Sequence, residues 1–291
     1  MCDILSYEDW IRTGVCISSE WISYKGKVMK ISIITITYYS EKTLEDTIRS
    51  IAKQQYANLE YLIVDGGSSD RTLDIISQYP EVVTKWISEP DQGISDAFNK
   101  GIRMATGDVI GIINSDDMLS ENALQLVADN MESDTDVFYG NTISFGEGIK
   151  KFRRRPEADL EVLRKGMALQ HPATFVRKSA YEKYGMFDLS YQCIMDRELL
   201  LRMYVGGAKF QYIDADLAWM RINGVSMTSY LDVTIPEGIR VSIKYGMSPF
   251  VAHLQGFCRA TRYRLTRFVR KFPVADFIRK YIHAKTTDLN V

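Results

Sequence analysis

The sequence predicts an α/β fold with a mostly parallel sheet, helices on both of its faces, and a helical, basic segment at the C-terminus. Two observations support this prediction. From Met29 onward, short β-branched and apolar runs alternate with segments of helical length, which is typical of strand–helix–strand units. Hydrophobic residues make up 46% of the 291 residues and charged residues 25%, so the chain has the composition of a globular protein with a sizeable core.

The elements of the first half alternate along the chain. Four segments are expected to form strands: 31–37, 59–64, 84–88 and 107–113. Four segments that follow them are expected to form helices: Glu41 to about Gln54, a helix from near Asp70, 93–103 and about 120–131. The first strand, ISIITIT, is apolar or β-branched at nearly every position, as a strand buried on both faces requires. Helices of this length between strands predict parallel pairing.

The second half is less regular. A strand is expected at 136–140 and another at 173–177, with a helix around 196–205. We interpret the basic segment 150–156 (KKFRRRP) as a turn, and from Ser229 the pattern is helical. Periodicity alone therefore gives less detail here than in the first half.

Three parts of the chain are expected. Residues 1–28 show no sustained period and precede the abrupt onset of the first strand, so we interpret them as an N-terminal extension, either an over-long start or an accessory helix. Residues 29–228 are expected to form the α/β domain, and residues 229–291 the C-terminal helical segment.

The net charge of −1 hides an uneven distribution. Residues 250–291 carry nine basic and two acidic side chains, whereas residues 1–249 carry 27 basic and 35 acidic ones. The tail places Phe257 and Leu265 among arginines at roughly helical spacing. We therefore expect an amphipathic helix over 250–285 that lies on an anionic membrane. The alternative is a helix packed on the α/β domain with a solvated basic face, and no nucleic acid is expected as a partner.

The expected location is the cytoplasm, peripherally at the inner face of the cell membrane. The four cysteines lie far apart and form no C-x-x-C pair, which argues against disulfides and zinc: Cys2, Cys16, Cys193 and Cys258. No apolar run approaches the roughly 18 residues of a membrane span. The N-terminus lacks the basic-then-apolar order of a secretory signal.

Polar residues follow four of the expected strands, where open parallel sheets bind their ligands. They are Thr37-Tyr38-Tyr39-Ser40, Asp65-Gly66-Gly67, Glu89-Pro90-Asp91 and Asn114-Ser115-Asp116-Asp117. No G-x-G-x-x-G follows the first strand and no phosphate-loop motif occurs, which argues against dinucleotide oxidoreductases and P-loop NTPases. Asp116 and Asp117 can offer oxygens to Mg²⁺ or Mn²⁺ beside a polyphosphate. Alternatively, this pair caps the helix that opens near Ser120.

Three blocks of sequence make the function more specific. MKISIITITYYSEKTLEDTIRSI, YLIVDGGSSDRT and EPDQGISDAFNKGIRMATGDVIGIINSDD resemble family 2 glycosyltransferases of the GT-A (Rossmann-like) fold. The nearest resemblance is to the branch that builds bacterial surface polysaccharides, including colanic-acid-type enzymes. It runs from about Lys30 to about Ser229, with matching order and spacing.

The resemblance implies a glycosyltransferase of hexosyltransferase type. Such an enzyme moves one sugar from a nucleotide-diphosphate sugar, by resemblance a UDP-sugar, to a hydroxyl of a glycan or lipid-linked glycan in cell-envelope polysaccharide biosynthesis. Transfer would invert the anomeric centre and need Mn²⁺ or Mg²⁺. The Q-x-x-R-W signature of processive synthases is missing, so a single transfer is expected.

The resemblance also implies roles on the donor side. Thr37, Tyr39 and Asp65 would line the nucleobase pocket. Three residues would flank the nucleotide, although turn and helix-start roles stay open for the first two: Asp91, Asn99 and Lys100. Asp117 resembles the main metal ligand and Asp116 the residue near the ribose. Asn114 stands where the family often has Asp.

The acceptor side is implied by the second half of the resemblance. Asp196 resembles the general base, with a helix N-terminal acid as the alternative. Glu198 or Asp188 can also serve as the base. His171 resembles the family's histidine near the donor diphosphate or the acceptor. Arg221, in MRINGVSMTS, can reach the diphosphate or be a solvated surface arginine.

Two other functions stay open. A sugar nucleotidyltransferase would normally show a Gly-rich loop with Arg and Lys after the first strand, and TYYSEKTLED has none. A non-catalytic nucleotide-sugar-binding module would need neither Asp196 nor the MRINGVS segment, and both are present.

Overall fold

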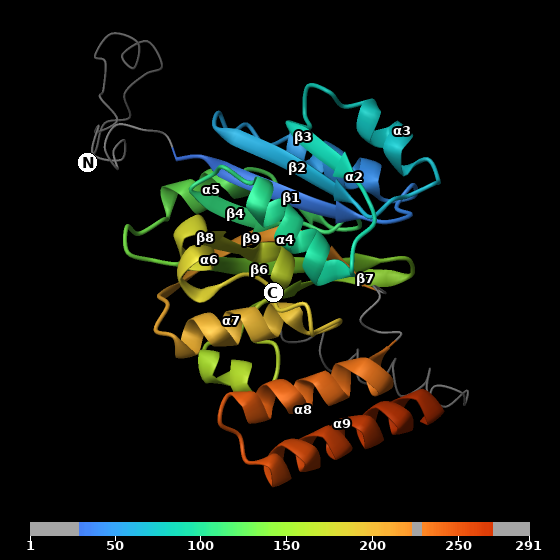
Figure 1. Ribbon diagram of the computed structural model, residues 1–291, viewed down its shortest axis with the longest axis vertical. Helices are drawn as coiled ribbons and strands as arrows, with labels where there is room; N and C mark the ends of the chain where they lie inside the picture. Colours follow the sequence, from blue (N-terminus) through green and yellow to red (C-terminus); the bar gives the residue numbers. More distant parts are fainter. Residues whose placement is uncertain (1–28, 223–228, 270–291) are drawn as a thin grey trace, which may run out of the picture.

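The computed structural model describes residues 29–222 and 229–269. The extension expected over 1–28 and the last part of the basic tail lie outside these residues. One sheet of nine strands runs through the described part, in the order β3-β2-β1-β4-β8-β6-β9-β5, with β7 paired to β6 (Figure 1). The predicted α/β class is confirmed.

The first half of the sheet is parallel, as the sequence predicts. Its strands are β1 (Ile31–Thr37), β2 (Leu59–Asp65), β3 (Lys85–Ser88) and β4 (Val109–Ile112). The register pairs Thr37 with Asp65, and Asp65 with Ser88. Because these residues end their strands, the polar segments after the strands lie at the same edge of the sheet.

The second half of the sheet is mixed, so parallel pairing extends less far than expected. Its strands are β5 (Met118–Leu119), β6 (Val137–Gly146), β8 (Thr174–Arg177) and β9 (Phe210–Arg221). β8 lies antiparallel to both β4 and β6, whereas β9 runs parallel to β6 and antiparallel to β5. The sequence did not predict β9, because its residues are mostly half-buried and show no alternation.

The interpretation of the basic segment 150–156 as a turn is wrong. Ile149–Arg154 forms strand β7, antiparallel to β6. Lys151 lies 4.6 Å from the centre of the Trp219 ring, and Arg153 forms an ion pair with Asp216 at 2.6 Å. Charged side chains are typical of edge strands, where they oppose pairing with another chain. Here they also conceal the apolar pattern by which a strand is usually found.

Helices cover both faces of the sheet. One face carries α2 (Leu44–Ala52), α3 (Thr72–Ser77) and α5 (Ala123–Asp129). The other face carries α4 (Ile94–Met104), α6 (Lys178–Tyr184) and α7 (Met195–Val205), with the short helix η2 (Leu160–Arg164). In the short helix η3 (His171–Ala173), Ala173 packs with the first set and the His171 ring lies against Phe98 of α4. Neighbouring strand residues serve opposite faces: Ile33 packs with the first set and Ile34 with the second. The predicted helices are confirmed within a few residues at their ends.

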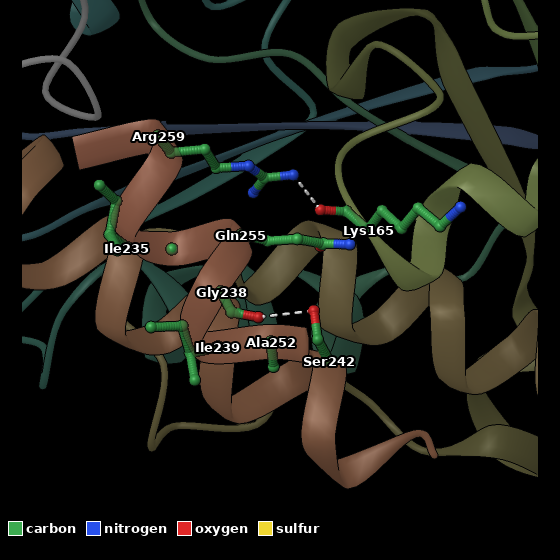
Figure 2. Close-up of a pocket in the computed structure, with 9 residues that line it drawn as sticks. Lys165, Ile235, Gly238, Ile239, Ser242, Ala252, Gln255 and Arg259 are labelled. Carbon is green, nitrogen blue, oxygen red and sulfur yellow. Dashed lines mark hydrogen bonds between the residues drawn. The ribbon is translucent and has the colours of Figure 1, made fainter. Parts of the chain in front are cut away.

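The helical pattern expected from Ser229 is present as far as the structure describes it. A short π-helix η5 (Tyr230–Thr234) leads into α8 (Ile235–Lys244) and α9 (Pro249–Val269), which form a hairpin beside α7 (Figure 1). Gly256 permits the close packing, because a Cβ there would lie 2.5 Å from Ile239 Cδ1. Arg259 donates to the carbonyl of Lys165 (Figure 2). The hairpin is therefore docked on the α/β domain.

No helix within 29–222 or 229–269 combines the length and apolar character needed to cross a bilayer.

Candidate active site

Asp65 organises the turn after β2. Its Oδ2 accepts the backbone N–H groups of Gly67 (3.0 Å) and Ser68 (2.8 Å) and the hydroxyl of Ser88 (2.6 Å), and its Oδ1 accepts the Ser68 hydroxyl (2.5 Å). The side chain is fully buried. In this structure Asp65 therefore fixes the turn, and its contact with a nucleobase stays a prediction.

An aromatic pair stands above the end of β1. Tyr38 and Tyr39 are 62% and 52% exposed, and their ring centres lie 4.4 Å apart, edge to face. Tyr39 has φ of +50° and donates its backbone N–H to Ser68 Oγ (2.9 Å). Left-handed backbone is uncommon for tyrosine and is often found at functional sites. Below the pair, Thr37 Oγ1 is buried and has no hydrogen-bond partner among the described residues.

Asp91 and Lys100 belong to the same edge. Asp91 accepts the Gly93 N–H (2.8 Å), and its Oδ2 would lie only 2.7 Å from a Cβ on Gly66, so the two loops touch. Lys100 Nζ donates to the Pro90 carbonyl (2.9 Å) and pairs with Glu89 (2.9 Å). Lys100, on α4, thus anchors the loop that contains Asp91.

Asn99 lies elsewhere. Its amide accepts the Phe187 N–H (2.9 Å) and donates to the Phe187 carbonyl (2.8 Å), and the side chain is buried. In this structure it joins α4 to the segment before α7. A role beside the nucleotide stays a prediction.

The loop after β4 meets the end of β9. Asp117 Oδ1 accepts the backbone N–H of Arg221 (2.8 Å), while Arg221 Nε donates to the carbonyl of Asp116 (3.1 Å). The guanidinium lies 4.6 Å from the centre of the Phe145 ring. Arg221 is therefore held at the acidic pair.

The acidic pair has the electrostatics of a cation site. Burial and the neighbouring Asp116 raise the pKa of Asp117 to about 8, and burial raises the pKa of Asp116. Two adjacent carboxylates with so little counter-charge fit a divalent metal ion. No three His, Cys, Asp or Glu side chains gather as a ligand set in the described part of the chain, so substrate and water would complete the shell.

Asp196 and His171 line one cavity of about 20 Å³, large enough for a water molecule. Asp196 lies in the first turn of α7, and its Oδ1 accepts the N–H of Arg197 (2.7 Å). His171 Nε2 is buried and unpaired within the described residues. Burial lowers the pKa of His171, although Asp196 acts in the opposite sense, so the imidazole is neutral near pH 7.

Glu198 and Asp188 are engaged in ion pairs. Glu198 is fully buried and accepts hydrogen bonds at 2.7–2.9 Å from Lys244, Tyr245 and Arg202. Burial alone would raise its pKa, but these contacts hold it below the ordinary value. The pKa of Asp188 is lowered too: burial opposes this, and hydrogen bonds from Ser190 and the charge of Lys244 outweigh it. Of the three candidate bases, Asp196 alone forms no ion pair among the described residues, and its role as the base stays a prediction.

Residues 32–202 match the sequence model of "Glycosyl transferase family 2". The chain belongs to this family. This glycosyltransferase is 32% identical over 179 residues to a PGL/p-HBAD biosynthesis glycosyltransferase of Mycobacterium bovis, a match that covers 60% of this chain and 69% of that one. The colanic-acid-type branch stays a prediction.

Solved structures share the fold of the transferase. S. aureus TarS 1–349 in complex with UDP-GlcNAc superposes with a TM-score of 0.59 at 17% identity, over 77% of this chain and 69% of that one. In another TarS structure the match spans only 41% of that chain. The mannosyltransferase PcManGT from Pyrobaculum calidifontis, in complex with GDP-Man and Mn²⁺, gives a TM-score of 0.59 at 17% identity, over 79% and 70% of the two chains.

Sequence reasoning on the transferase assigned no role to Tyr38, although it listed the segment that contains it, and none to Glu237. Tyr38 adjoins a predicted site residue, so the Tyr-Tyr pair was a usable signal. Glu237, on α8, accepts the backbone N–H groups of residues 192–194 just before α7. No local pattern marks that contact.

Proposed function

We propose that the protein transfers a single sugar from a UDP-sugar to a hydroxyl of a lipid-linked glycan, with metal dependence and inversion of the anomeric centre. The observation that carries the proposal is the junction of Asp117 and Arg221, where an acidic pair with a buried Asp117 and a guanidinium meet at the ends of the strands. Family membership and the UDP-GlcNAc complex of TarS support this choice of donor.

On the donor side, Thr37 and Tyr39 border the nucleobase, and Asp65 keeps the adjoining turn in shape. Asp116 and Asp117 hold Mn²⁺ or Mg²⁺, which supplies Lewis-acid neutralisation of the departing diphosphate. The Mn²⁺ in the PcManGT complex supports a divalent ion. Arg221 adds a second positive charge beside the diphosphate.

On the acceptor side, Asp196 accepts the proton of the attacking hydroxyl. The acceptor oxygen forms a bond to the anomeric carbon while the bond from that carbon to the diphosphate oxygen breaks, and the nucleoside diphosphate leaves with the electron pair. Attack from the face opposite the leaving group inverts the configuration. His171 stays neutral, so it does not cancel the negative charge that Asp196 needs as a base.

Helix α9 supports the proposal of a lipid-linked acceptor. Ala252 and Gly256 pack toward the domain, whereas an apolar stripe on the opposite side is exposed: Phe250, Leu254, Phe257 and Leu265. Arg262 and Arg264 flank this stripe on the helix, and no acidic residue occurs between Pro249 and Val269. This arrangement suits an anionic membrane surface, with the stripe among the acyl chains and the arginines at the head groups. We propose that the enzyme is a peripheral membrane protein that meets a lipid-linked acceptor there.

The test is a transfer assay with a panel of UDP- and GDP-sugars and lipid-linked acceptors, with Mn²⁺, Mg²⁺ or chelator. We expect release of UDP only with metal and acceptor, and a product of inverted anomeric configuration by NMR. Thermal shift with each donor measures binding separately, because a ligand that binds only the folded state stabilises it. Donor binding without transfer to any acceptor would indicate a binding module instead.

A further inference from the structure

The segment that leads into helix α7, which carries Asp196, is held by a residue from the C-terminal hairpin. Glu237 on α8 accepts the N–H of Gln192 at Oε1 (2.7 Å) and the N–H groups of Cys193 (2.9 Å) and Ile194 (3.3 Å) at Oε2. Ile194 is the N-cap residue of α7, whose backbone N–H has no partner within the helix, and Gln192 and Cys193 directly precede it, so Glu237 fixes the backbone from which the helix starts. The carboxylate is 8% exposed.

A second set of bonds crosses the same interface in the opposite direction. Arg197, next to Asp196, is 3% exposed and donates to the Gly238 carbonyl (3.3 Å) and to Ser242 Oγ (2.9 Å) on α8. It also donates to the carbonyls of Leu163 (2.8 Å) and Arg164 (2.7 Å). Figure 2 shows Ser242 bonded in turn to Gly238. The chain is thus tied to neighbouring elements on both sides of Asp196, by backbone N–H groups before it and by the Arg197 side chain after it.

We propose that Glu237 is a positioning residue for sugar transfer, acting through Asp196. This inference rests on the proposed role of Asp196 as the base. Asp196 lies in the first turn of α7, two residues after Ile194, so a shift of the segment that Glu237 holds would move the Asp196 carboxylate. A shift of about 1 Å in a reacting group can cost roughly 100-fold in rate. The hairpin that presents the apolar stripe of α9 therefore also aligns the base.

The experiment compares Glu237→Ala and Glu237→Gln with Glu182→Gln, a change at an exposed glutamate on α6. Donor titration gives the fraction of molecules that bind donor, and kcat is expressed per binding-competent molecule. Glu237→Ala should lower kcat by about 10–100-fold with donor KM unchanged. Glu237→Gln should recover part of the loss, because its amide oxygen still accepts a hydrogen bond. Glu182→Gln should match wild type.

A double-mutant cycle separates positioning from general damage. If Glu237 acts through Asp196, then Glu237→Ala adds no further loss to Asp196→Asn. Losses that multiply, or a donor KM that rises with the fall in kcat, would overturn the proposal. If Asp196→Asn alone retains wild-type transfer, the base assignment fails, and this result is distinct from a failure of Glu237.

Discussion

Arg221 donates its backbone N–H to the carboxylate of Asp117 at 2.8 Å, across 104 positions of the chain. This bond joins the end of β9 to the loop after β4, and the Arg221 side chain reaches the carbonyl of Asp116. The acidic motif and the segment 220–222 are therefore two sides of one site.

Asp117→Asn should abolish metal-dependent donor binding without unfolding the protein. The substitution removes a ligand charge and also relieves repulsion between the buried carboxyl of Asp117 and the half-buried carboxyl of Asp116. We expect titration calorimetry with UDP and Mn²⁺ to show no metal-dependent binding, while the melting temperature in chelator stays equal or rises by a few degrees. Asp232→Asn, at an exposed position, is the control. Wild-type donor affinity for Asp117→Asn in Mn²⁺ would contradict the metal site.

Asp196→Asn should separate binding from turnover. The amide keeps the size of the side chain but cannot take a proton, so transfer should fall by about 10²–10⁴-fold while donor affinity survives. Steady-state kinetics and a donor Kd measure the two quantities.

Glu198→Gln is the informative comparison for that variant. It removes the charge of a fully buried glutamate from its ion pairs with the partly exposed Arg202 and Lys244 and should destabilise the fold by about 1.5–3 kcal/mol. Denaturant unfolding would show this. A stable Glu198→Gln that has lost only turnover would move the base to Glu198.

Glu60 should make stability depend on pH in the acid range. Burial alone would raise its pKa, but hydrogen bonds from Ser32, Thr106 and Lys30 lower it to about 2. Because the folded pKa lies below the unfolded value, the stabilisation is complete above about pH 4.5 and is lost as the pH falls toward 2.

Glu60→Gln should therefore cost about 1–3 kcal/mol at pH 7 and flatten the dependence between pH 4.5 and 2. Urea unfolding at several pH values measures both, with exposed Glu81→Gln as the control. An unchanged slope would show that Glu60 is not the group responsible.

Gly66→Ala should weaken donor binding. The new Cβ would lie 2.7 Å from Asp91 Oδ2 and 3.2 Å from the Tyr38 ring, so both of these side chains at the proposed donor site would have to move. We expect donor KM to rise roughly 10-fold with little change in melting temperature, because the contact lies in surface loops. Gly166→Ala is the control, since its methyl group would meet only the Arg259 guanidinium, at 3.5 Å. Equal donor KM for both variants would argue against this role of Asp91.

Leu254→Asp with Phe257→Asp should release the protein from anionic vesicles. The pair places charge in the exposed stripe of α9 without touching the face that packs on α8. Co-sedimentation with vesicles of phosphatidylglycerol and phosphatidylcholine should fall to the level seen with phosphatidylcholine alone. Transfer to a water-soluble acceptor should be unchanged. If vesicle binding depends neither on lipid charge nor on these substitutions, the proposal that α9 binds an anionic membrane is wrong.

Apolar patterns in the sequence predicted the strands whose side chains are buried on both faces of the sheet. β1 and β2 are buried on both faces, so their apolar runs are visible in the sequence. β7 and β9 lie in exposed or half-buried surroundings, and their polar residues conceal the strands. The same division holds for the site. The motif predicted that Asp117 follows a strand at the ligand-binding edge, and its metal binding stays a prediction, whereas the bond from Asn99 to Phe187 depends on how distant elements pack.

On the proposed membrane-bound state, the opposite faces of α9 have a consequence for how the enzyme finds its acceptor. Gly256 faces α8 and Phe257 faces outward. If the exposed apolar side chains of α9 insert into a bilayer, the protein is therefore held in one orientation relative to the membrane. Diffusion is then confined to two dimensions, and encounters scale with molecules per unit area. The rate of transfer should accordingly follow the surface density of the acceptor lipid, and dilution of the whole suspension at constant lipid composition should leave it nearly constant.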